Sequence, residues 1–289
     1  MIEKSELILN GDGSIFHLHL KPENLADKII LVGDQARVDA VALLFDSIEF
    51  SVQNREFRSV TGSYKGTRFT VLSTGIGTDN IDIVMNELDA LVNIDIGRRE
   101  IQQEKKSLSI VRIGTSGALQ SDLPLNSFVV SKKSIGFDGM LNFYANREQV
   151  CDLPFEKAFI QFTGWDDSFP TPYVVDASNK LISKFDSSEF IKGVTISAPG
   201  FYGPQGRVLR LPLAMPDLNR RIERFRFDDL KITNFEMESS AIYGLSKMLG
   251  HKALAICLII ANRTTGKSNE NYHPEMKKLI ERVLNYLIN

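Results

Sequence analysis

Short apolar runs rich in branched residues recur along this chain, and segments with helical periodicity separate them. Each run has the length and composition of a buried strand. The runs are Lys28–Val32, Arg68–Leu72, Leu108–Arg112, Phe128–Val130, Val194–Ile196 and Ala253–Ile260. Strands that alternate with helices in this way are typical of an α/β fold, in which helices cover the faces of a central sheet.

Helices are predicted where apolar residues repeat at three- and four-residue spacing. They span Asn80–Asn93, Ala177–Phe185, Met237–Leu249 and Glu275–Leu287. No low-complexity segment, linker rich in Pro and Ser, or fixed-period repeat divides the chain. We therefore expect a single α/β domain over residues 1–289 rather than modules joined by a hinge.

The charge balance argues against a general nucleic-acid-binding protein. A formal net charge of −2 and a pI near 6.1 provide no basic surface for a polyanion. The charged stretches 97–106 and 220–226 are interpreted as solvent-exposed segments. Phosphate recognition, if present, is expected to be local.

Neither export nor membrane insertion is expected. The N-terminus lacks the basic start and the continuous apolar stretch of a secretion signal, and the apolar run 253–261 is far shorter than the roughly 20 residues that span a bilayer. Cys151 and Cys257 lie far apart in the sequence, and we expect both to be reduced. These features predict a cytoplasmic protein.

Glycine-bearing segments follow two of the predicted strands, where α/β proteins bind ligands. Gly33 would let the backbone approach a small anion, and Arg37 would offer a planar fork of donors, although a plain turn also fits. The segment Leu72–Thr78 carries a G-x-G pair before a predicted helix, whose N-terminal amides suit an anion. It lacks the third glycine of a dinucleotide fingerprint, so nicotinamide binding is not favoured.

Arg112 is expected to close an apolar strand, where a lone charge is costly unless it is paired or binds an anion. Thr115 and Ser116 follow it with hydroxyl groups beside two glycines. An anion site and a structural salt bridge of Arg112 both fit this pattern.

Two carboxylates, Glu236 and Glu238, lie two residues apart where a strand is predicted to end and a helix to begin. One carboxylate can accept hydrogen bonds from two adjacent hydroxyls, such as a ribose diol, and its charge favours a developing cation at the sugar. The alternative is that both residues interact with the helix N-terminus.

Taken in this order, the segments resemble the nucleoside phosphorylase superfamily, and in particular its uridine phosphorylases, through nearly the whole chain. The matching stretches are Phe16–Leu18, Gly33–Val38, Asn54–Phe57, Ser73–Gly77, Arg112–Ala118, Asp138–Gly139, Phe201–Arg207, Phe235–Glu238 and Asn262–Thr264. The resemblance implies a central, mixed, twisted sheet that is partly barrel-like and is flanked by helices. It also implies a pentosyltransferase that uses inorganic phosphate as co-substrate and needs no metal or organic cofactor.

By this resemblance, a group of backbone and cationic side chains would hold the phosphate. The members of this group are Gly33, Arg37, Arg112 and Thr115, with Arg55 reaching in from a neighbouring subunit. Several cations around one dianion satisfy its charge. The active site would then be shared between two subunits, and three such dimers would form the hexamer common among bacterial relatives.

The ribose hydroxyls would bind Glu238, with Met237 packed under the sugar and Glu236 close by. His17 would be contributed by the partner chain. The resemblance therefore predicts that residues from both ends of the chain, and from two subunits, surround one sugar.

The base would lie against Phe201, with Gln205 and Arg207 reading the uracil edge. Four further residues would line its pocket, namely Ser116, Gly117, Ile260 and Ala261. An amide pairs with the adjacent acceptor and donor of a pyrimidine, and a guanidinium stabilises negative charge as the base departs. Gln205, Arg207 and Glu238 are the residues that we expect to act in catalysis.

Departures from the family pattern affect mainly the base site. Purine-cleaving relatives carry an aspartate after the late strand that protonates the leaving purine, whereas this chain offers Asn262 and Arg263. The order Gly203-Pro204 in the base loop reverses the usual one, which would shift Gln205. The sequence thus disfavours purine phosphorolysis but leaves open whether uridine, deoxyuridine or thymidine is preferred.

Some relatives bind a monovalent cation between paired subunits with an acidic side chain, a backbone oxygen and a serine. Glu56 and Ile76 match that pattern, but Asn80 takes the place of the serine, which argues against an ion there. His19 and His251 are assigned no role.

The function predicted from these residues is the phosphorolysis of a pyrimidine nucleoside in nucleoside salvage and catabolism. A phosphorylase of another nucleoside and a nucleosidase that uses water are alternatives within enzymes. An inactive nucleoside-binding protein or a purely structural homo-oligomer on the same fold would be alternatives from other classes.

Overall fold

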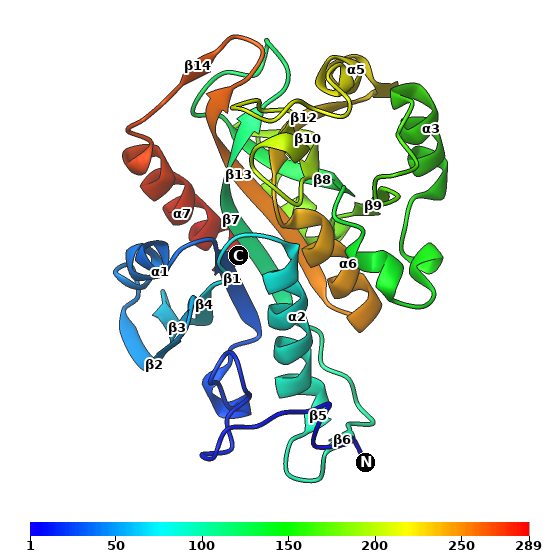
Figure 1. Ribbon diagram of the computed structural model, residues 1–289. Helices are drawn as coiled ribbons and strands as arrows, with labels where there is room; N and C mark the ends of the chain where they lie inside the picture. Colours follow the sequence, from blue (N-terminus) through cyan, green and yellow to red (C-terminus); the bar gives the residue numbers. More distant parts are fainter. Residues whose placement is uncertain (289) are drawn as a thin grey trace.

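The computed structural model describes residues 1–288, and Figure 1 shows its sheet with helices on both sides. The strands of the main sheet are β1 Lys28–Val32, β2 Ser47–Asn54, β3 Phe57–Tyr64, β4 Thr67–Ser73, β7 Ser109–Ala118, β8 Phe128–Gly136, β9 Tyr173–Asp176, β10 Phe190–Ser197, β11 Arg226–Phe227, β12 Leu230–Glu236, β13 Lys252–Asn262 and β14 Lys267–Ser268. Their order is β11-β12-β10-β8-β13-β7-β1-β4-β3-β2, with β14 on β13 and β9 on β8.

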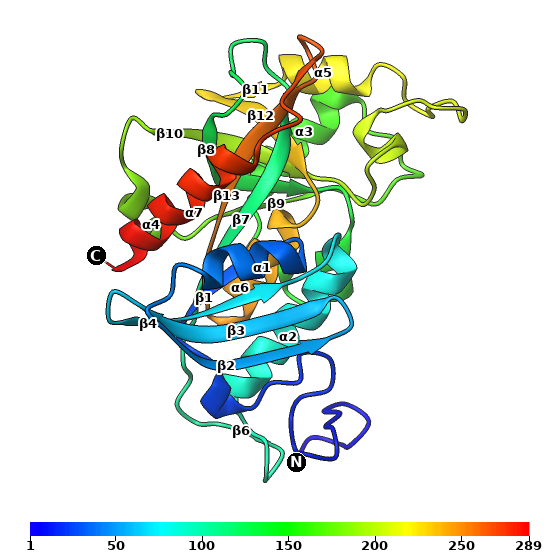
Figure 2. The same cartoon turned by 90° about the vertical axis from the view of Figure 1, so that its left-hand side faces the viewer.

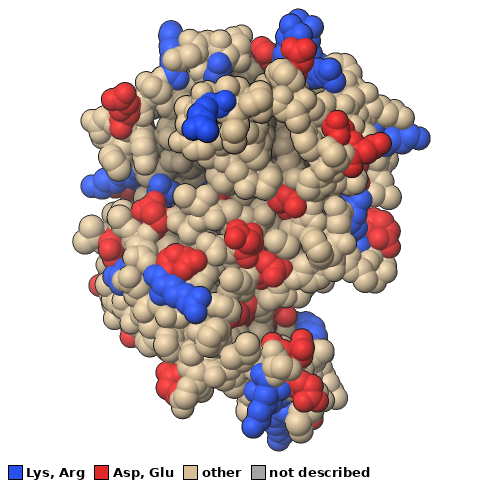
Figure 3. Space-filling model, in the orientation of Figure 1, with Lys and Arg blue, Asp and Glu red and all other residues tan. Residues whose placement is uncertain are grey.

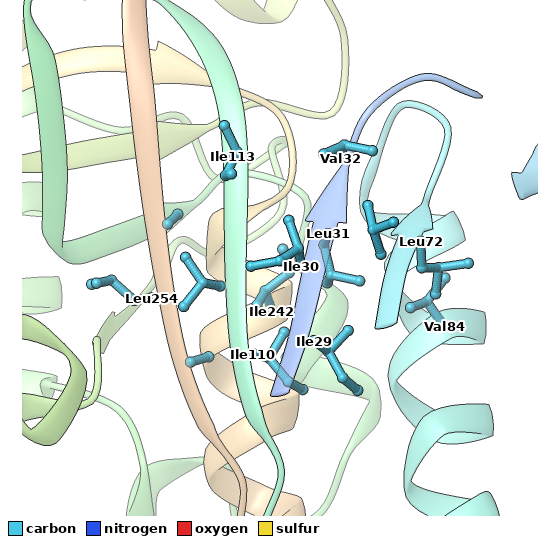
Figure 4. Packing of buried hydrophobic residues seen from close by; sticks show 14 of the residues in the cluster. Ile29, Ile30, Leu31, Val32, Leu72, Val84, Ile110, Ile113, Ile242 and Leu254 are labelled. Atoms are coloured by element: carbon cyan, nitrogen blue, oxygen red, sulfur yellow. The ribbon is translucent and has the colours of Figure 1, made fainter. Parts of the chain in front are cut away.

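The predicted apolar runs form the centre of this sheet. Strand β1 pairs in parallel with both β4 and β7, and β7 pairs in parallel with β13. Side chains of these strands interdigitate with those of the neighbouring helices, as Figure 4 shows for Ile30, Ile110, Ile242 and Leu254. Strands that are buried on both faces have a continuous apolar sequence, which is why these strands could be predicted from the sequence alone.

One end of the sheet closes on itself. Strand β12 pairs with β10 and also, antiparallel, with β7, so that β7, β13, β8, β10 and β12 form a ring. The pairings along the sheet include parallel and antiparallel ones. This arrangement confirms the predicted α/β class with a mixed, partly barrel-like sheet, whereas the assignment of residues 1–289 to one domain stays a prediction.

The helices are α1 Gln35–Ala42, α2 Thr78–Asn93, α3 Leu153–Thr163, α4 Asn179–Ile182, α5 Leu218–Arg224, α6 Ser239–Leu249 and α7 His273–Ile288. Helices α2 and α6 pack together on one side of the central strands, and Figures 1 and 2 place α1 and α7 on the other. Their apolar faces cover the sheet, and α7 buries residues at three- and four-residue spacing from Met276 to Leu287.

Two predicted elements differ from the structure. The helix expected over Ala177–Phe185 is the short α4 followed by a 3-10 turn, Ser183–Phe185. The strand expected to end at Arg112 continues as β7 to Ala118, because β13 and then β12 supply pairing partners for the added residues. Thr115 and Ser116 therefore lie within a strand and not in the loop after it.

The surface agrees with the charge balance of the sequence. Lys, Arg, Asp and Glu side chains are interspersed on the face shown in Figure 3, with no large area of one sign. The stretch 97–106 is largely exposed, although a small hairpin of β5 Ile94–Asp95 and β6 Glu100–Ile101 enters it. None of the helices described between residues 1 and 288 has the length and apolar character needed to cross a membrane.

Candidate functional site

The loops after the parallel strands β1 and β4 meet at one edge of the sheet, beside β7. Val32, the last residue of β1, is in register with Ser73 of β4 and with Ile113 of β7. Gly33 follows at once, and a methyl group on its Cα would lie 4.0 Å from the carbonyl oxygen of Gly75. The glycine segments singled out in the sequence thus adjoin one another where α/β folds bind ligands.

Arg37 projects from the first turn of α1 toward the same edge. Asp34 caps this helix by accepting a hydrogen bond from the backbone N–H of Arg37 at 2.8 Å, and it pairs with the guanidinium at 3.0 Å. The other guanidinium nitrogen, Nη1, donates to the carbonyl oxygen of Ile113 at 3.5 Å. The cation therefore lies next to β7, close to Gly33.

Arg112 and Glu238 form a buried ion pair between β7 and the start of α6. Both residues are about 95% buried, and Gly77 at the start of α2 donates its N–H to the other oxygen of Glu238 at 2.9 Å. Gly114 makes room for the guanidinium, because a Cβ there would lie 1.9 Å from Nη1 of Arg112. Within residues 1–288, Nε and Nη1 of Arg112 have no hydrogen-bond partner.

The two carboxylates of the strand-to-helix junction differ in their surroundings. Glu236 accepts hydrogen bonds from the hydroxyls of Ser197 and Ser239, at 2.5 Å and 2.7 Å, and from the backbone N–H groups of Glu238 and Ser239. Glu236 thereby caps α6. Interaction of these carboxylates with the helix N-terminus was one of the two alternatives that the sequence left open. Glu238 instead faces Arg112 and Gly77, and the half-buried Met237 lies between the two carboxylates in sequence.

Burial raises the pKa of Glu238 from 4.5 to about 6. The charge of Arg112 opposes this rise and the charge of Glu236 adds to it. The pair is therefore ionised at neutral pH, with a carboxylate that begins to take up a proton in mild acid.

A second group of residues gathers at the base loop. The Nη1 group of Arg207 donates to the side-chain oxygen of Gln205 and to the carbonyl oxygen of Phe201, both at 2.6 Å. Its guanidinium lies over the Phe201 ring, 3.7 Å from the centroid. Gln205 is buried, whereas Phe201 is about half exposed.

Arg263, just after β13, joins this group. The sequence analysis placed it, with Asn262, where purine-cleaving relatives carry an aspartate, but assigned it no role. It donates to the backbone oxygen of Gln205, lies 5.7 Å from the ring centroid of Phe235, and would contact a methyl group on Gly117 at 3.7 Å. Burial, aided by the charge of Arg207, lowers the pKa of Arg263 to about 10. Two guanidinium groups thus adjoin Gln205.

The remaining predicted base residues lie on β7 and β13 beside this group. Ser116 accepts a hydrogen bond from the side chain of Asn234 at 2.9 Å. Ser116 and Gly117 pair with Ile259 and Ala261, so that a bulge falls at Ile260. A bulge next to a site changes the direction of a side chain, and here it interrupts the strand that lines the pocket.

The comparisons with known proteins agree with this geometry. The sequence matches the phosphorylase superfamily over residues 27–288. It is 30% identical over 284 residues to a uridine phosphorylase of Thermococcus kodakarensis, with 93% of this chain and 87% of the relative covered. The chain belongs to the phosphorylase superfamily. Its resemblance to uridine phosphorylases, and its nature as a nucleoside phosphorylase and pentosyltransferase, are thereby confirmed.

Two further relatives show that the similarity establishes the family but not the base on which the enzyme acts. A crystal structure of a Trypanosoma brucei nucleoside phosphorylase that shows uridine phosphorylase activity matches with a TM-score of 0.87 and 31% identity, covering 98% of this chain and 99% of that one. A guanosine phosphorylase of Halorubrum lacusprofundi is 26% identical, with 94% of this chain and 96% of the relative covered. Relatives of similar identity thus act on different bases.

In this nucleoside phosphorylase, one of the two residues expected to serve a partner's site lies away from Glu238. His17 contacts Glu87 of α2, which is ten residues beyond Gly77 and so about 15 Å along the helix axis. Arg55 is exposed, with its guanidinium 6.0 Å from the ring of Phe16 and its backbone oxygen accepting from the side chain of Gln35 at 2.8 Å. The fold therefore keeps His17 away from the ion pair of its own chain and leaves the side chain of Arg55 at the surface.

The residues weighed for a monovalent cation also adjoin one another. A Cβ on Gly75 would lie 2.5 Å from the side-chain nitrogen of Asn80 and 3.2 Å from Glu56, and Ile76 is the next residue. No cluster of three or more His, Cys, Asp or Glu side chains within residues 1–288 is arranged to hold a metal ion.

An apolar cavity of about 320 Å³ lies behind the base loop. Gly203, Pro204 and Gly206 form part of its wall, opposite Trp165 and Phe169. Asn219 of α5, which also borders the cavity, donates to the backbone oxygen of Gln205 at 3.0 Å. No sequence signal pointed to Asn219 or Glu87, because each acts on a site residue that is distant in the chain.

Proposed function

We propose that this nucleoside phosphorylase is specific for pyrimidine nucleosides and converts uridine and phosphate to uracil and ribose 1-phosphate. The observation that carries the proposal is the joined pair of Gln205 and Arg207 beside the Phe201 ring. Because Arg207 donates to the amide oxygen of Gln205, the amide nitrogen of Gln205 remains as a donor for a ligand. Donors at this end suit the carbonyl oxygens of uracil and the negative charge that develops on it as it leaves.

The position of Asn262 supports the same choice of base. Its side-chain nitrogen donates to the carbonyl oxygens of Gln120 and Leu123, both at 2.9 Å, and its oxygen accepts from the N–H groups of Thr264 and Thr265. A fully engaged amide cannot protonate a leaving purine in the way that the aspartate of purine-cleaving relatives does. We infer that Asn262 holds the loop after β13 in place instead of acting on the base.

Phosphate binding is assigned to Gly33, Arg37, Arg112 and Thr115, with Arg55 of a second subunit. Arg112 contributes in a particular way, because Nη2 is engaged with Glu238 and Nη1 lies 4.0 Å from Glu236, while neither Nε nor Nη1 has a hydrogen-bond partner within residues 1–288. One guanidinium can thus hold a phosphate oxygen and orient the ribose-binding carboxylate at the same time.

Glu238 would bind the ribose diol, with Met237 under the sugar and Glu236 fixing the turn. Phosphate attacks the anomeric carbon from the face opposite the base, and the C–N bond breaks with its electron pair passing to the uracil ring. Gln205 and Arg207 stabilise the uracil anion, while the carboxylate of Glu238 favours the oxocarbenium-like sugar. Positioning and electrostatics account for the rate.

We also propose that two subunits share each site, as the separation of His17 from Glu238 and the exposure of Arg55 suggest, and that three dimers associate. Mixing inactive Glu238→Ala and Arg55→Ala proteins should restore activity, because one site of each mixed dimer is native. Absence of recovery, with mixed dimers shown by mass spectrometry, would mean that sites are not shared. The two free cysteines agree with an intracellular enzyme.

The deciding experiment is absorbance-monitored cleavage of uridine, thymidine and inosine, each with and without inorganic phosphate. Phosphate-dependent loss of uridine, with inosine untouched, is the expected result. Cleavage of inosine would indicate a purine enzyme, which the guanosine phosphorylase relative favours. Cleavage without phosphate would indicate a nucleosidase, and no cleavage of any substrate would indicate a binding protein.

A further inference from the structure

The carboxylate of Glu87 collects three hydrogen-bond donors from one turn of the N-terminal segment. It accepts from the backbone N–H of His17 at 3.0 Å, from the N–H of Leu18 at 2.9 Å and from Nδ1 of the His17 ring at 2.6 Å. Glu87 lies in the body of α2, so these contacts are not those of a helix cap. Its side chain is 13% exposed, and that of His17 is 26% exposed.

The backbone of His17 is held from the opposite direction as well. Asn54, at the end of β2, donates its side-chain N–H to the carbonyl oxygen of His17 at 2.8 Å. The imidazole lies edge-on to Phe16 and to Phe57, with centroid distances of 4.8 Å and 6.4 Å. The position and the plane of the ring are thus both fixed.

These contacts also decide which ring nitrogen is free. A carboxylate can only accept, so Nδ1 of His17 must carry the hydrogen in the contact with Glu87. In neutral imidazole, Nε2 then has a lone pair and acts as an acceptor. A partner that fixes the tautomer of a histidine in this way is a common device around functional histidines.

We propose that Glu87 is a positioning residue that presents Nε2 of His17 as an acceptor to the 5′-hydroxyl of a nucleoside in the neighbouring subunit. This inference rests on the proposed function and deepens it. Glu238 is suited to the 2′,3′-diol of the ribose, so the 5′-hydroxyl is the donor that remains for a second subunit. Glu87 does not touch the substrate, and its effect passes entirely through His17.

The variant Glu87→Gln separates this role from simple anchoring. Its amide oxygen still accepts from the two backbone N–H groups and keeps the segment in place. That oxygen competes poorly for the ring N–H, and the amide nitrogen, if turned toward Nδ1, would donate to it and reverse the tautomer. Asp82→Asn, on the same helix, is the matched control, because Asp82 accepts from Tyr144 and Asn86 and contacts neither His17 nor Leu18.

The test compares uridine with 5′-deoxyuridine at saturating phosphate. Glu87→Gln should lower kcat/KM for uridine roughly ten-fold, mainly through KM, and leave 5′-deoxyuridine within about two-fold of wild type. Asp82→Asn should behave as wild type with both substrates. Equal losses on both substrates would show a merely structural role, and no loss on uridine would show no role.

A second measurement does not require activity. Nitrogen-15 NMR of the four histidines, with His17 assigned from a His17→Asn variant, should give the Nδ1–H tautomer in the native protein and a changed one in Glu87→Gln. An unchanged tautomer would overturn the proposal. If the native enzyme cleaves inosine and not uridine, the base assignment fails, and the comparison is made with inosine and 5′-deoxyinosine. If it cleaves no nucleoside, the proposed function and this inference fail together, whatever the tautomer.

Discussion

The ion pair of Arg112 and Glu238 and the base loop from Phe201 to Arg207 are the two halves of the proposed site, and they are built in opposite ways. The pair is buried between a central strand and a helix start, with Gly77 and Gly114 shaped around it. The loop is largely exposed and is held by side chains that bind its carbonyl oxygens.

This difference separates reaction type from choice of base. A buried ion pair cannot lose one partner without leaving an uncompensated charge, so it tolerates little change. A loop held by a few hydrogen bonds can adopt another course without disturbing the sheet. The similarity of this chain to relatives that act on uridine and on guanosine is consistent with such a division.

The largest effect is expected at the ion pair. Arg112→Ala should lower kcat/KM for uridine by about three orders of magnitude and destabilise the fold by about 3–5 kcal/mol, because Glu238 is left buried and unpaired. Kinetics and thermal unfolding measure the two effects. In the double variant Arg112→Met/Glu238→Met, stability should recover in part and activity should not. Arg98→Ala, at an 80% exposed side chain, is the control, and a loss there of similar size would contradict the argument.

Arg207→Ala tests the loop half. It should lower kcat about 100-fold, because a donor aimed at the charge of the leaving base acts mainly in the transition state. Gln205→Ala should affect kcat less, and stability should change little in either variant, since the loop is not part of the core. Arg210→Ala, three residues further along the same exposed stretch, is the control. Near-normal turnover in Arg207→Ala would remove this residue from the mechanism.

The pH dependence of kcat/KM tests the ion-pair half of the site by itself, because the raised pKa of Glu238 lies near 6. With its pKa raised to about 6, Glu238 gains a proton as the pH falls below 6, so uridine kcat/KM should fall about ten-fold between pH 7 and pH 5. The ratio of wild type to Glu238→Gln isolates this step from the ionisation of phosphate. A constant ratio would exclude Glu238 as the group responsible.

Stability should follow the opposite trend. Between the ordinary pKa of 4.5 and the folded value of about 6, the folded protein holds the proton and the unfolded chain does not. The contribution of Glu238 therefore favours folding below pH 4.5 and is lost as the pH rises through 6, by about 2 kcal/mol in all. Urea unfolding of wild type against Glu238→Gln at pH 4.5 and pH 7 would measure it.

The smallest effect is expected at Asn219, which touches only the carbonyl oxygen of Gln205. Asn219→Ala should loosen the amide and reduce the preference for uridine over inosine a few-fold, with about 1 kcal/mol or less lost in stability. Competition between the two nucleosides in one reaction gives the ratio directly. Asn86→Ala, at an exposed asparagine that also donates to a backbone oxygen, should leave the ratio unchanged. An equal change in both variants would argue against control of the loop through Asn219.

How well the sequence predicted the site also differs between the buried ion pair and the base loop. Arg112 stood out because a charge in an apolar run needs a partner, but the sequence left an anion and a salt bridge as alternatives. The structure gives a salt bridge that leaves Nε and Nη1 without a hydrogen-bond partner in the described part of the chain, residues 1–288. The expected end of the strand at Arg112 was wrong, because apolar periodicity does not register the pairing that extends β7 to Ala118.

The sequence by itself determined the alternation of strands and helices, the central buried strands, and the residue types gathered after them. Those properties are written in local periodicity and composition. Only the tertiary structure decided that the sheet closes through β12 and β7, that Arg263 and Asn219 hold Gln205, and that Glu87 orients His17. Contacts of this kind join residues 14 to 118 positions apart, and no local pattern encodes them, because they depend on where the whole chain brings its strands together.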